Sequence, residues 1–203
     1  MGGDYFDVLV LSEDVLGLCI ADVAGKGIPA ALLMSNLQAA VKGLSSPSLA
    51  PDSLCNSLNS LVWRNTHTDR FITLFYAQLD GPARRLRYAN AGHNAPIVVR
   101  AGGTHERLRE GGGVLGVFEE QSFGLGTVDL APGDRLVLFT DGVTEASNGE
   151  GEEFGEQRLL SLLEEHRALS ANAIKEKIAA AISEFSGGHL TDDATLLVLA
   201  VEA

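Results

Sequence analysis

The chain is poor in cysteine and has no long hydrophobic run. Its two cysteines, Cys19 and Cys55, are too few for a disulfide framework and lack the spacing of a zinc site. We therefore expect two small buried thiols in a reducing compartment, which predicts a cytoplasmic location. No apolar stretch approaches the length of a membrane helix, and no basic segment followed by an apolar one opens the chain. The sequence predicts no association with a membrane.

Basic residues are also scarce. The 15 Lys and Arg are outnumbered by 27 Asp and Glu, so the formal net charge is −12. This balance argues against a nucleic-acid partner and against an anionic membrane surface, because both attract Lys and Arg. Two interpretations of the acidic excess stay open: a solvated acidic surface, and carboxylates gathered around cations.

Internal repeats, linkers and low-complexity segments are absent, which predicts one domain over residues 1–203. Asp4 lies so close to the first residue that a functional acid there would be poorly held. We therefore expect the natural domain to extend further toward the N-terminus, so that the chain is truncated at that end.

Patterns of apolar residues predict the secondary structure. Strand-like runs are joined mostly by short turns, and helices come in blocks of two, which favours an α+β fold with antiparallel sheet. Three strand pairs are expected: 5–11 with 15–21, 70–80 with 84–90, and 122–130 with 134–140. Further strands are expected at 97–100 and 194–201, a surface segment without strands at 101–120, and helices at 29–44, 53–65, 156–165 and 170–186. The inner face of the first helix is expected to carry Ala30, Leu33, Met34, Leu37, Val41 and Leu44.

One stretch, residues 16–34, combines a buried strand, an acid, a glycine-rich turn and an amphipathic helix. Asp22 stands where the strand ends, before Gly25 and Gly27, so it is either the cap of the following helix or a ligand. In the hairpin expected just before it, Asp4 lies at the same end as Asp22. This placement is the first indication of a site.

Four aspartates share this context at the end of a strand, beside glycine or another acid. Each alone is more often a turn or cap residue, but their recurrence favours a common role. Several carboxylates at one sheet edge repel each other unless a cation lies among them. Oxygen-only ligands favour Mg²⁺ or Mn²⁺, and two such ions would lower the pKa of a water and screen a phosphoester. The four are Asp4, Asp22, Asp141 and Asp192.

Five segments, in order along nearly the whole chain, resemble the motifs of the SpoIIE-type branch of the metal-dependent Ser/Thr protein phosphatases. The resemblance implies two antiparallel β-sheets packed as a sandwich, with helix pairs on the outer faces. It also implies two Mn²⁺ or Mg²⁺ ions at one end of the sandwich. The segments are 2–7 (GGDYFD), 21–27 (ADVAGKG), 90–96 (NAGHNAP), 139–146 (FTDGVTEA) and 192–197 (DDATLL).

The same resemblance implies the roles of individual residues. Asp4 and Asp22 would reach the metals, with Asp22 bridging both ions, and the carbonyl of Val23 would be a further ligand. Asp141 and Asp192 would complete one ion. Asp22 and Asp141 are the residues on which catalysis would most depend. Asp193 and Asp7 are weaker candidates that rank below these five.

The chain also departs from the family pattern. Val23 and Ala24 stand where the wider family has Gly and a His proposed as general acid, and the phosphate-binding Arg of the family has no upstream position here. His93 is either an acid or support for the site, or a turn histidine bonded to backbone. Lys26 either meets a phosphate or is solvated, and the surrounding glycines do not have the spacing of a Walker loop.

The resulting hypothesis is hydrolysis of phosphoserine or phosphothreonine by metal-activated water, without a covalent phosphoenzyme. The resemblance implies a small phosphorylated regulatory protein, of the anti-anti-sigma type, as substrate. The alternative is a catalytically degenerate phosphatase fold that binds phosphoproteins without turnover. Because the helices expected at 29–44 and 53–65 follow the Asp22 turn, we also expect control by an upstream sensor or activator, as a domain or a separate protein.

Overall fold

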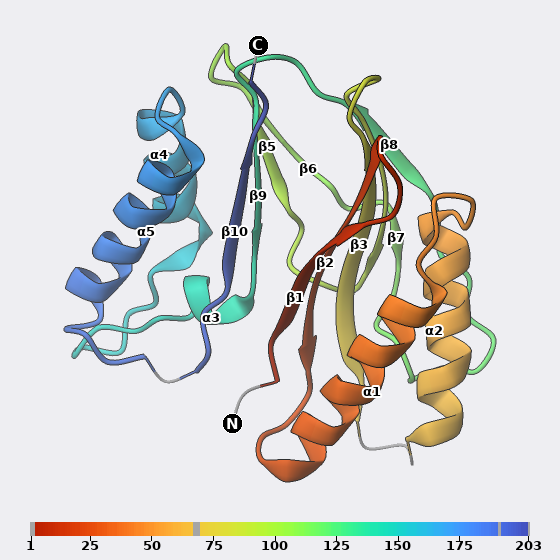
Figure 1. Ribbon diagram of the computed structural model, residues 1–203. Helices are drawn as coiled ribbons and strands as arrows, with labels where there is room; N and C mark the ends of the chain where they lie inside the picture. The colour runs from red at the N-terminus through yellow and green to blue at the C-terminus, as the bar shows by residue number, and fades with distance from the viewer. Residues whose placement is uncertain (1–2, 67–69, 191, 203) are drawn as a thin grey trace. The chain divides into compact units, whose positions relative to one another are not determined.

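The computed structural model describes residues 3–66, 70–190 and 192–202. The chain divides into two compact units. Unit 1 is Met1–Ala95 with Leu108–Asp129, and unit 2 is Pro96–Arg107 with Leu130–Ala203. Each unit has its own sheet and its own pair of long helices (Figure 1). The predicted α+β class, with two sheets and helix pairs, is confirmed, whereas a single domain over 1–203 stays a prediction.

The sheet of unit 1 is mostly antiparallel and has the strand order β1-β2-β3-β4-β7, with β8 also paired to β4. The predicted hairpins between β1 and β2 and between β3 and β4 are confirmed. Only the short pairing of β4 with β7 is parallel. The strands are β1 (Tyr5–Val10), β2 (Val15–Val23), β3 (Ile72–Asp80), β4 (Arg85–Ala91), β7 (Gly111–Gly112) and β8 (Gly126–Asp129).

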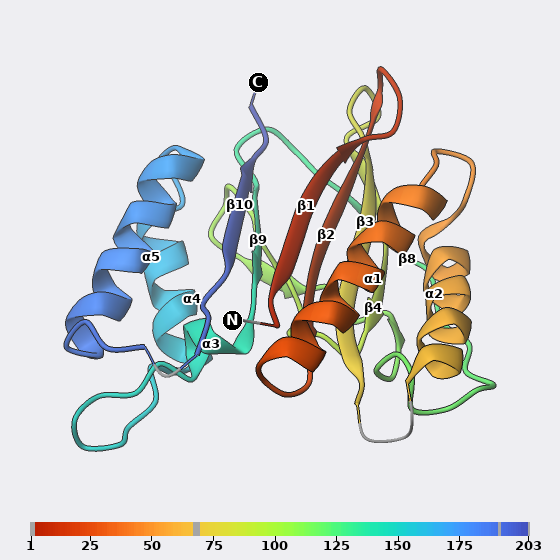
Figure 2. The same cartoon turned by 60° about the horizontal axis from the view of Figure 1, so that its bottom comes forward.

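Two helices, α1 (Ile28–Leu44) and α2 (Pro51–Asn65), lie along one face of this sheet, as both views show (Figures 1 and 2). Four of the six apolar residues predicted for the inner face of α1 are buried, and Met34 packs against the core. Leu44 is 39% exposed, so its inclusion in that face was wrong. It is the last residue of the helix, where the chain turns away into the loop that precedes α2.

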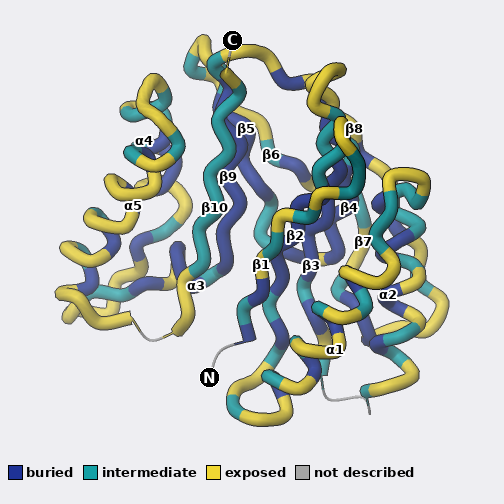
Figure 3. Tube along the Cα trace, viewed as in Figure 1, coloured by how far each residue is buried: buried dark blue, intermediate teal, exposed yellow. Residues whose placement is uncertain are grey.

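Unit 2 has a four-stranded antiparallel sheet in the order β10-β9-β5-β6. Its long helices carry Leu159, Leu163, Ile174 and Ile178 into a core shared with β5 and β9. Strand β9 is fully buried, whereas β10, at the edge of the sheet, is half-buried (Figure 3). The elements are β5 (Ile97–Val99), β6 (His105–Arg107), β9 (Arg135–Phe139), β10 (Leu196–Ala200), α3 (Asp141–Thr144), α4 (Gly155–His166) and α5 (Ala171–Phe185).

The predicted pairing of 122–130 with 134–140 was wrong. Strand β8 pairs with β4 in unit 1, whereas β9 pairs with β5 and β10 in unit 2. The turn at residues 131–133 reverses the chain, but it does not select the strand's partner. The carboxylate of Asp134 accepts hydrogen bonds from the backbone N–H of Ala101 and from Arg100, and so holds the start of β9 beside the end of β5.

Residues 101–120 are also more structured than predicted. They contain β6 and β7, and they bury the side chains of Leu108 and Leu115. Isolated apolar residues in a glycine-rich segment carry no periodic signal, so their burial was not visible in the pattern. Cys19 and Cys55 are both buried and free, as predicted. Among the described residues, no helix is long and apolar enough to cross a membrane.

Candidate metal-binding site

Asp22 is the second-to-last residue of strand β2, and its side chain is half-buried. Helix α1 begins six residues later and is capped by Gly27, whose φ of 84° suits glycine and which offers no side chain. Asp22 is therefore not the cap of α1. Of the two roles that the sequence left open, the structure rules out the cap, and the role of ligand stays a prediction.

Gly3 lies against two of the predicted ligand atoms. A Cβ at this position would stand 2.6 Å from the carbonyl oxygen of Val23 and 2.7 Å from Oδ1 of Asp22. Any side chain here would fill the space in front of both oxygens. The backbone N–H of Val23 donates to the carbonyl of Gly3 at 3.3 Å, which fixes the approach of the two strands. Two oxygen donors thus converge on a space that glycine keeps open.

Asp4 lies beside Asp22, as the hairpin predicted, because Tyr5 pairs with Ala21 and the next position on each strand is an aspartate. Side chains alternate along a strand, so Asp7 belongs to the opposite face of the sheet from Asp4. Its carboxylate lies 3.0 Å from Nζ of Lys42 and accepts a hydrogen bond from the hydroxyl of Tyr5. Partial burial opposes the charge of Asp7, but these partners hold its pKa below the usual value. Asp7 is engaged in this ion pair and leaves the candidate set.

In unit 2, Asp141 is the first residue of α3, directly after the buried strand β9. The hydroxyl of Thr140 accepts a hydrogen bond from the N–H of Thr195, and the N–H of Thr140 donates to the carbonyl of Thr195. These bonds continue the pairing of β9 with β10 and bring the segment that contains Asp192 beside Asp141. A Cβ on Gly142 would stand 1.9 Å from the carbonyl oxygen of Asp193, so this close approach requires glycine.

Glu145 belongs to the same group of acids, although it was not among the site residues predicted from the sequence. Burial raises its pKa above the usual value, and the negative charges of Asp141, Glu153 and Asp192 raise it further. Its position four residues after Asp141, one helical turn away, was the signal that could have found it. Burial is the larger cause of this raised pKa, and the three neighbouring carboxylates add to it.

His93 is 6% exposed and lies after β4 in unit 1. Its Nδ1 is 2.9 Å from the hydroxyl of Thr73, and the side chain of Asn90 bonds both its backbone N–H and its carbonyl. His93 therefore has the backbone bonds of a turn histidine and, in addition, a side-chain contact toward β3. Lys26 is exposed, which agrees with the solvated alternative.

The donor set in each unit fits a hard cation. Asp4, Asp22 and the carbonyl of Val23 offer oxygen atoms in unit 1, and Asp141 and Asp192 offer oxygen atoms in unit 2. In the portion of the chain that the structure describes, no group of three or more His, Cys, Asp or Glu side chains could hold a metal ion. Three of the five predicted residues lie in unit 1 and two in unit 2, and their joint binding of metal ions stays a prediction.

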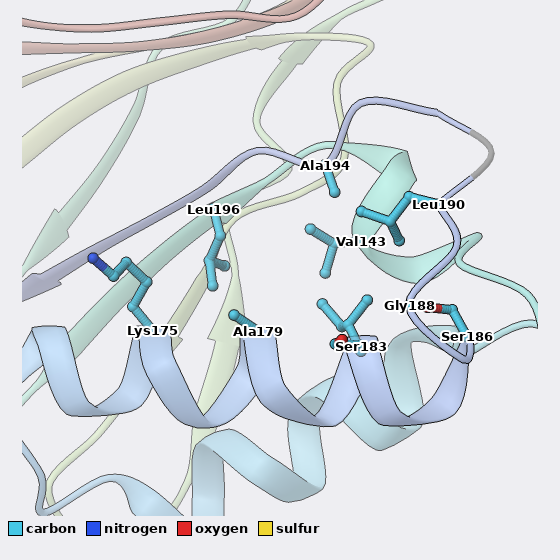
Figure 4. Close-up of a pocket in the computed structure, with 10 residues that line it drawn as sticks. Val143, Lys175, Ala179, Ser183, Ser186, Gly188, Leu190, Ala194 and Leu196 are labelled. Atoms are coloured by element: carbon cyan, nitrogen blue, oxygen red, sulfur yellow. The ribbon is translucent and has the colours of Figure 1, made fainter.

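A pocket of about 310 Å³ lies in unit 2 next to the segment that carries Asp192. It opens between α5 and the residues that lead into β10, and its wall is mainly apolar (Figure 4). Leu190 and Ala194, which flank Asp192 in the sequence, point into it, as do Val143 and Leu196.

A family model described as Stage II sporulation protein E (SpoIIE) matches residues 12–202. The phosphoserine phosphatase RsbU of Bacillus subtilis (strain 168) is 36% identical over 201 residues, which cover 98% of this chain. The chain spans 59% of the length of RsbU, so it corresponds to part of that relative.

Two solved structures share the fold over almost the entire chain. The SiaA-PP2C domain of Pseudomonas aeruginosa superimposes with a TM-score of 0.84 at 23% identity, covering 99% of this chain and 81% of that domain. RsbX in complex with magnesium superimposes with a TM-score of 0.72 at 17% identity, covering 98% of this chain and 86% of RsbX.

Proposed function

The chain belongs to the SpoIIE family, and from this membership we propose that it is a serine/threonine protein phosphatase acting on a small phosphorylated regulatory protein. The 36% identity with a phosphoserine phosphatase, over nearly the whole chain, supports phosphoserine as a substrate. The anti-anti-sigma type of substrate rests on the resemblance of the motifs. The net charge of −12 disfavours a nucleic-acid substrate.

The observation that carries the proposal is the convergence of Asp22 Oδ1 and the Val23 carbonyl oxygen on the space that Gly3 leaves open. We propose that Asp4, Asp22 and Val23, together with Asp141 and Asp192, hold two Mn²⁺ or Mg²⁺ ions, with Asp22 shared by both. When bound, such ions supply an activated water and screen the charge of a phosphate. The magnesium complex of RsbX, a relative in fold, agrees with an ion of this class.

The chain's own residues have distinct tasks in this proposal. Strand β2 holds Asp22 between β1 and β3, so the carboxylate is oriented before any ion arrives. Asp141 is fixed by the helical turn of α3, whose Thr144 hydroxyl bonds back to the carbonyl of Asp141. No side chain of the chain is needed as a nucleophile, which agrees with hydrolysis without a covalent phosphoenzyme.

Control by an upstream sensor or activator, as a domain or a separate protein, is also proposed. Helix α1 starts six residues after Asp22, and α1 and α2 pack in the same core as Val23. A shift of these helices would therefore move the turn that carries two proposed ligands. The chain's span of 59% of RsbU is compatible with such a segment in the relative.

The direct test is hydrolysis of p-nitrophenyl phosphate and of a phosphoserine peptide with Mn²⁺ or Mg²⁺. We expect turnover that EDTA abolishes, and a loss of about a thousandfold in Asp22→Asn and Asp141→Asn, because a lost ligand charge costs several kcal/mol of transition-state stabilisation. The matched control is Asp129→Asn, which removes an exposed carboxylate paired with Arg85 and should keep full activity. Activity that ignores EDTA and both variants would refute the proposal.

Calorimetric titration with Mn²⁺ separates the phosphatase from the alternative, a degenerate module that binds phosphoproteins. The phosphatase should bind two ions, and Asp22→Asn should weaken both, because Asp22 is proposed to be shared. Tight binding of a phosphopeptide, with one weak ion or none and no turnover, would favour the alternative.

A further inference from the structure

A row of polar side chains crosses the ends of three strands in unit 1 and continues to His93. Asp4 lies beside Asp22, Asp22 pairs directly with Thr73, and Thr73 contacts His93. Residues directly opposite each other in a sheet share one face, so the first three side chains belong to the same face. This face is opposite the one that carries Ala21 and Val23 into the core under α1.

His93 is placed in this row by a rigid local structure. Gly92 has φ 67° and lies so close to Val114 that a Cβ would stand 2.6 Å from a methyl group of that residue. The side chain of Asn90, itself 4% exposed, bonds both the N–H and the carbonyl of His93. These bonds fix the backbone of His93, and the contact with the Thr73 hydroxyl holds the imidazole ring.

The hydroxyl of Thr73 connects His93 with the backbone of Asp22. The hydroxyl of Thr73 donates to the backbone carbonyl of Asp22 across 3.4 Å, and it lies 2.9 Å from Nδ1 of His93. A hydroxyl has one proton, so while Thr73 donates to Asp22 it must accept from His93. The chain of donors then runs from His93 Nδ1–H to Thr73 Oγ1 and on to the carbonyl of Asp22.

The end of this chain is the peptide plane between Asp22 and Val23. Thr73 contacts its carbonyl from β3, and Gly3 accepts its N–H from β1. The plane links the Cα atoms of Asp22 and Val23, the two residues that carry the proposed ligand oxygens. We infer that Thr73 and His93 are positioning residues, which fix this plane and thereby orient both oxygens toward the ion. The inference rests on the proposed function of the site.

The test measures Mn²⁺ affinity of the full chain by calorimetry, independently of turnover. Groups that orient ligands without touching the metal commonly contribute 10- to 100-fold in affinity, so we expect about a tenfold loss in Thr73→Val and in His93→Leu. Thr73→Ser keeps the hydroxyl, and His93→Asn keeps a donor near the position of Nδ1; both should stay within about twofold of wild type. The two residues act through one series of hydrogen bonds. The double variant Thr73→Val/His93→Leu should therefore bind Mn²⁺ no more weakly than the single variant with the lower affinity.

A second readout is the ¹⁵N NMR spectrum of His93, which should show a protonated Nδ1 in the wild type and a changed tautomer balance in Thr73→Val. If the wild type binds Mn²⁺ and Thr73→Val binds it with the same affinity, the inference is overturned while the proposed function stands. A fall in kcat for His93→Leu at unchanged Mn²⁺ affinity would also overturn it, since His93 would then act on the substrate. A wild-type chain that binds no Mn²⁺ would refute the metal-dependent function itself.

Discussion

In unit 1 the candidate ligands lie on paired strands, whereas in unit 2 they lie on one turn of helix and an exposed loop. Asp22 is on a strand that is hydrogen-bonded on both sides, and its neighbour Gly3 is buried. Asp192 is exposed, and its carboxylate accepts a hydrogen bond from the N–H of the next residue. The backbone ladder therefore orients the acids of unit 1, while in unit 2 hydrogen bonds of the Thr140 and Thr144 hydroxyls supplement the backbone contacts.

The two units should therefore respond to different kinds of substitution. A ladder of backbone hydrogen bonds is insensitive to the loss of one surface side chain, but it is sensitive to any atom placed between its strands. A loop held by side chains has the opposite sensitivities. Three substitutions test this contrast between the units, and their expected effects decrease from Asp134→Ala to Lys42→Ala.

Asp134→Ala should destabilise unit 2 strongly. The carboxylate is 2% exposed, and it accepts hydrogen bonds from Arg100 and from the N–H groups of Ala101 and Ala131. Burial raises the pKa of Asp134, but these bonds outweigh that effect and lower it overall. Removing the carboxylate leaves buried donors without a partner, at a cost of about 3 kcal/mol.

Urea denaturation of the wild type and Asp134→Ala at pH 7 measures this cost. Because the pKa is lowered in the folded state, the stabilising effect is present above the usual value of 3.8 and is lost as the pH falls through the lowered value. The two proteins should therefore converge in stability as acid is added. Equal free energies of unfolding of the wild type and Asp134→Ala at pH 7 would show that unit 2 does not depend on the Asp134 carboxylate.

Gly3→Ala should impair unit 1 at the site rather than in its stability. The added Cβ would stand 2.7 Å from Asp22 Oδ1, so the carboxylate has to move, and we expect Mn²⁺ affinity to fall about tenfold. The control is Gly43→Ala in α1, where nothing lies within 4 Å of the new Cβ. It should leave metal binding unchanged and add about 0.5–1 kcal/mol of stability. If both variants bind Mn²⁺ as the wild type does, the space in front of Gly3 is not a metal site.

Lys42→Ala should have the smallest effect. Lys42 pairs with Asp7 at 3.0 Å, but its side chain is 51% exposed, so the pair should contribute only about 0.2–1 kcal/mol. The pKa of Asp7 is lowered despite partial burial, so this contribution exists at pH 7 and disappears as the pH falls below 3.8. Thermal unfolding at pH 7 and at acid pH checks the sign. A decrease in the free energy of unfolding as large as that expected for Asp134→Ala would contradict the contrast between the units.

Several features followed from local sequence alone, and each has a local physical cause. The hairpin of β1 and β2 was predicted because two alternating runs flank a short polar turn, and its register placed Asp4 beside Asp22. The helix at 170–186 was predicted because Ile174, Ile178 and Ile182 recur at helical spacing, and the structure shows Ser170 as its cap. Cys19 and Cys55 were expected to be buried because nothing in their spacing suggested another role.

Other features were decided by contacts between residues far apart in the sequence. Nothing local shows that β8 pairs with β4, that Asp134 ties β9 to β5, or that Asp7 faces Lys42 rather than Asp4. The candidate site shows the same division: the sequence supplied the acids, but Thr73 carries no local signal, and its place beside His93 comes from the folding of β3 against β4.

Apart from β6, β7 and α3, local sequence was enough to predict the strands and helices, the acids at strand ends and the resemblance to a phosphatase. These depend on periodicity, turn residues and short motifs, all of which act over a few residues. Only the tertiary structure decided the strand partners, the face of each aspartate and the contacts of Gly3, Thr73 and His93. These depend on the pairing of distant strands, for which a short stretch of sequence holds no record.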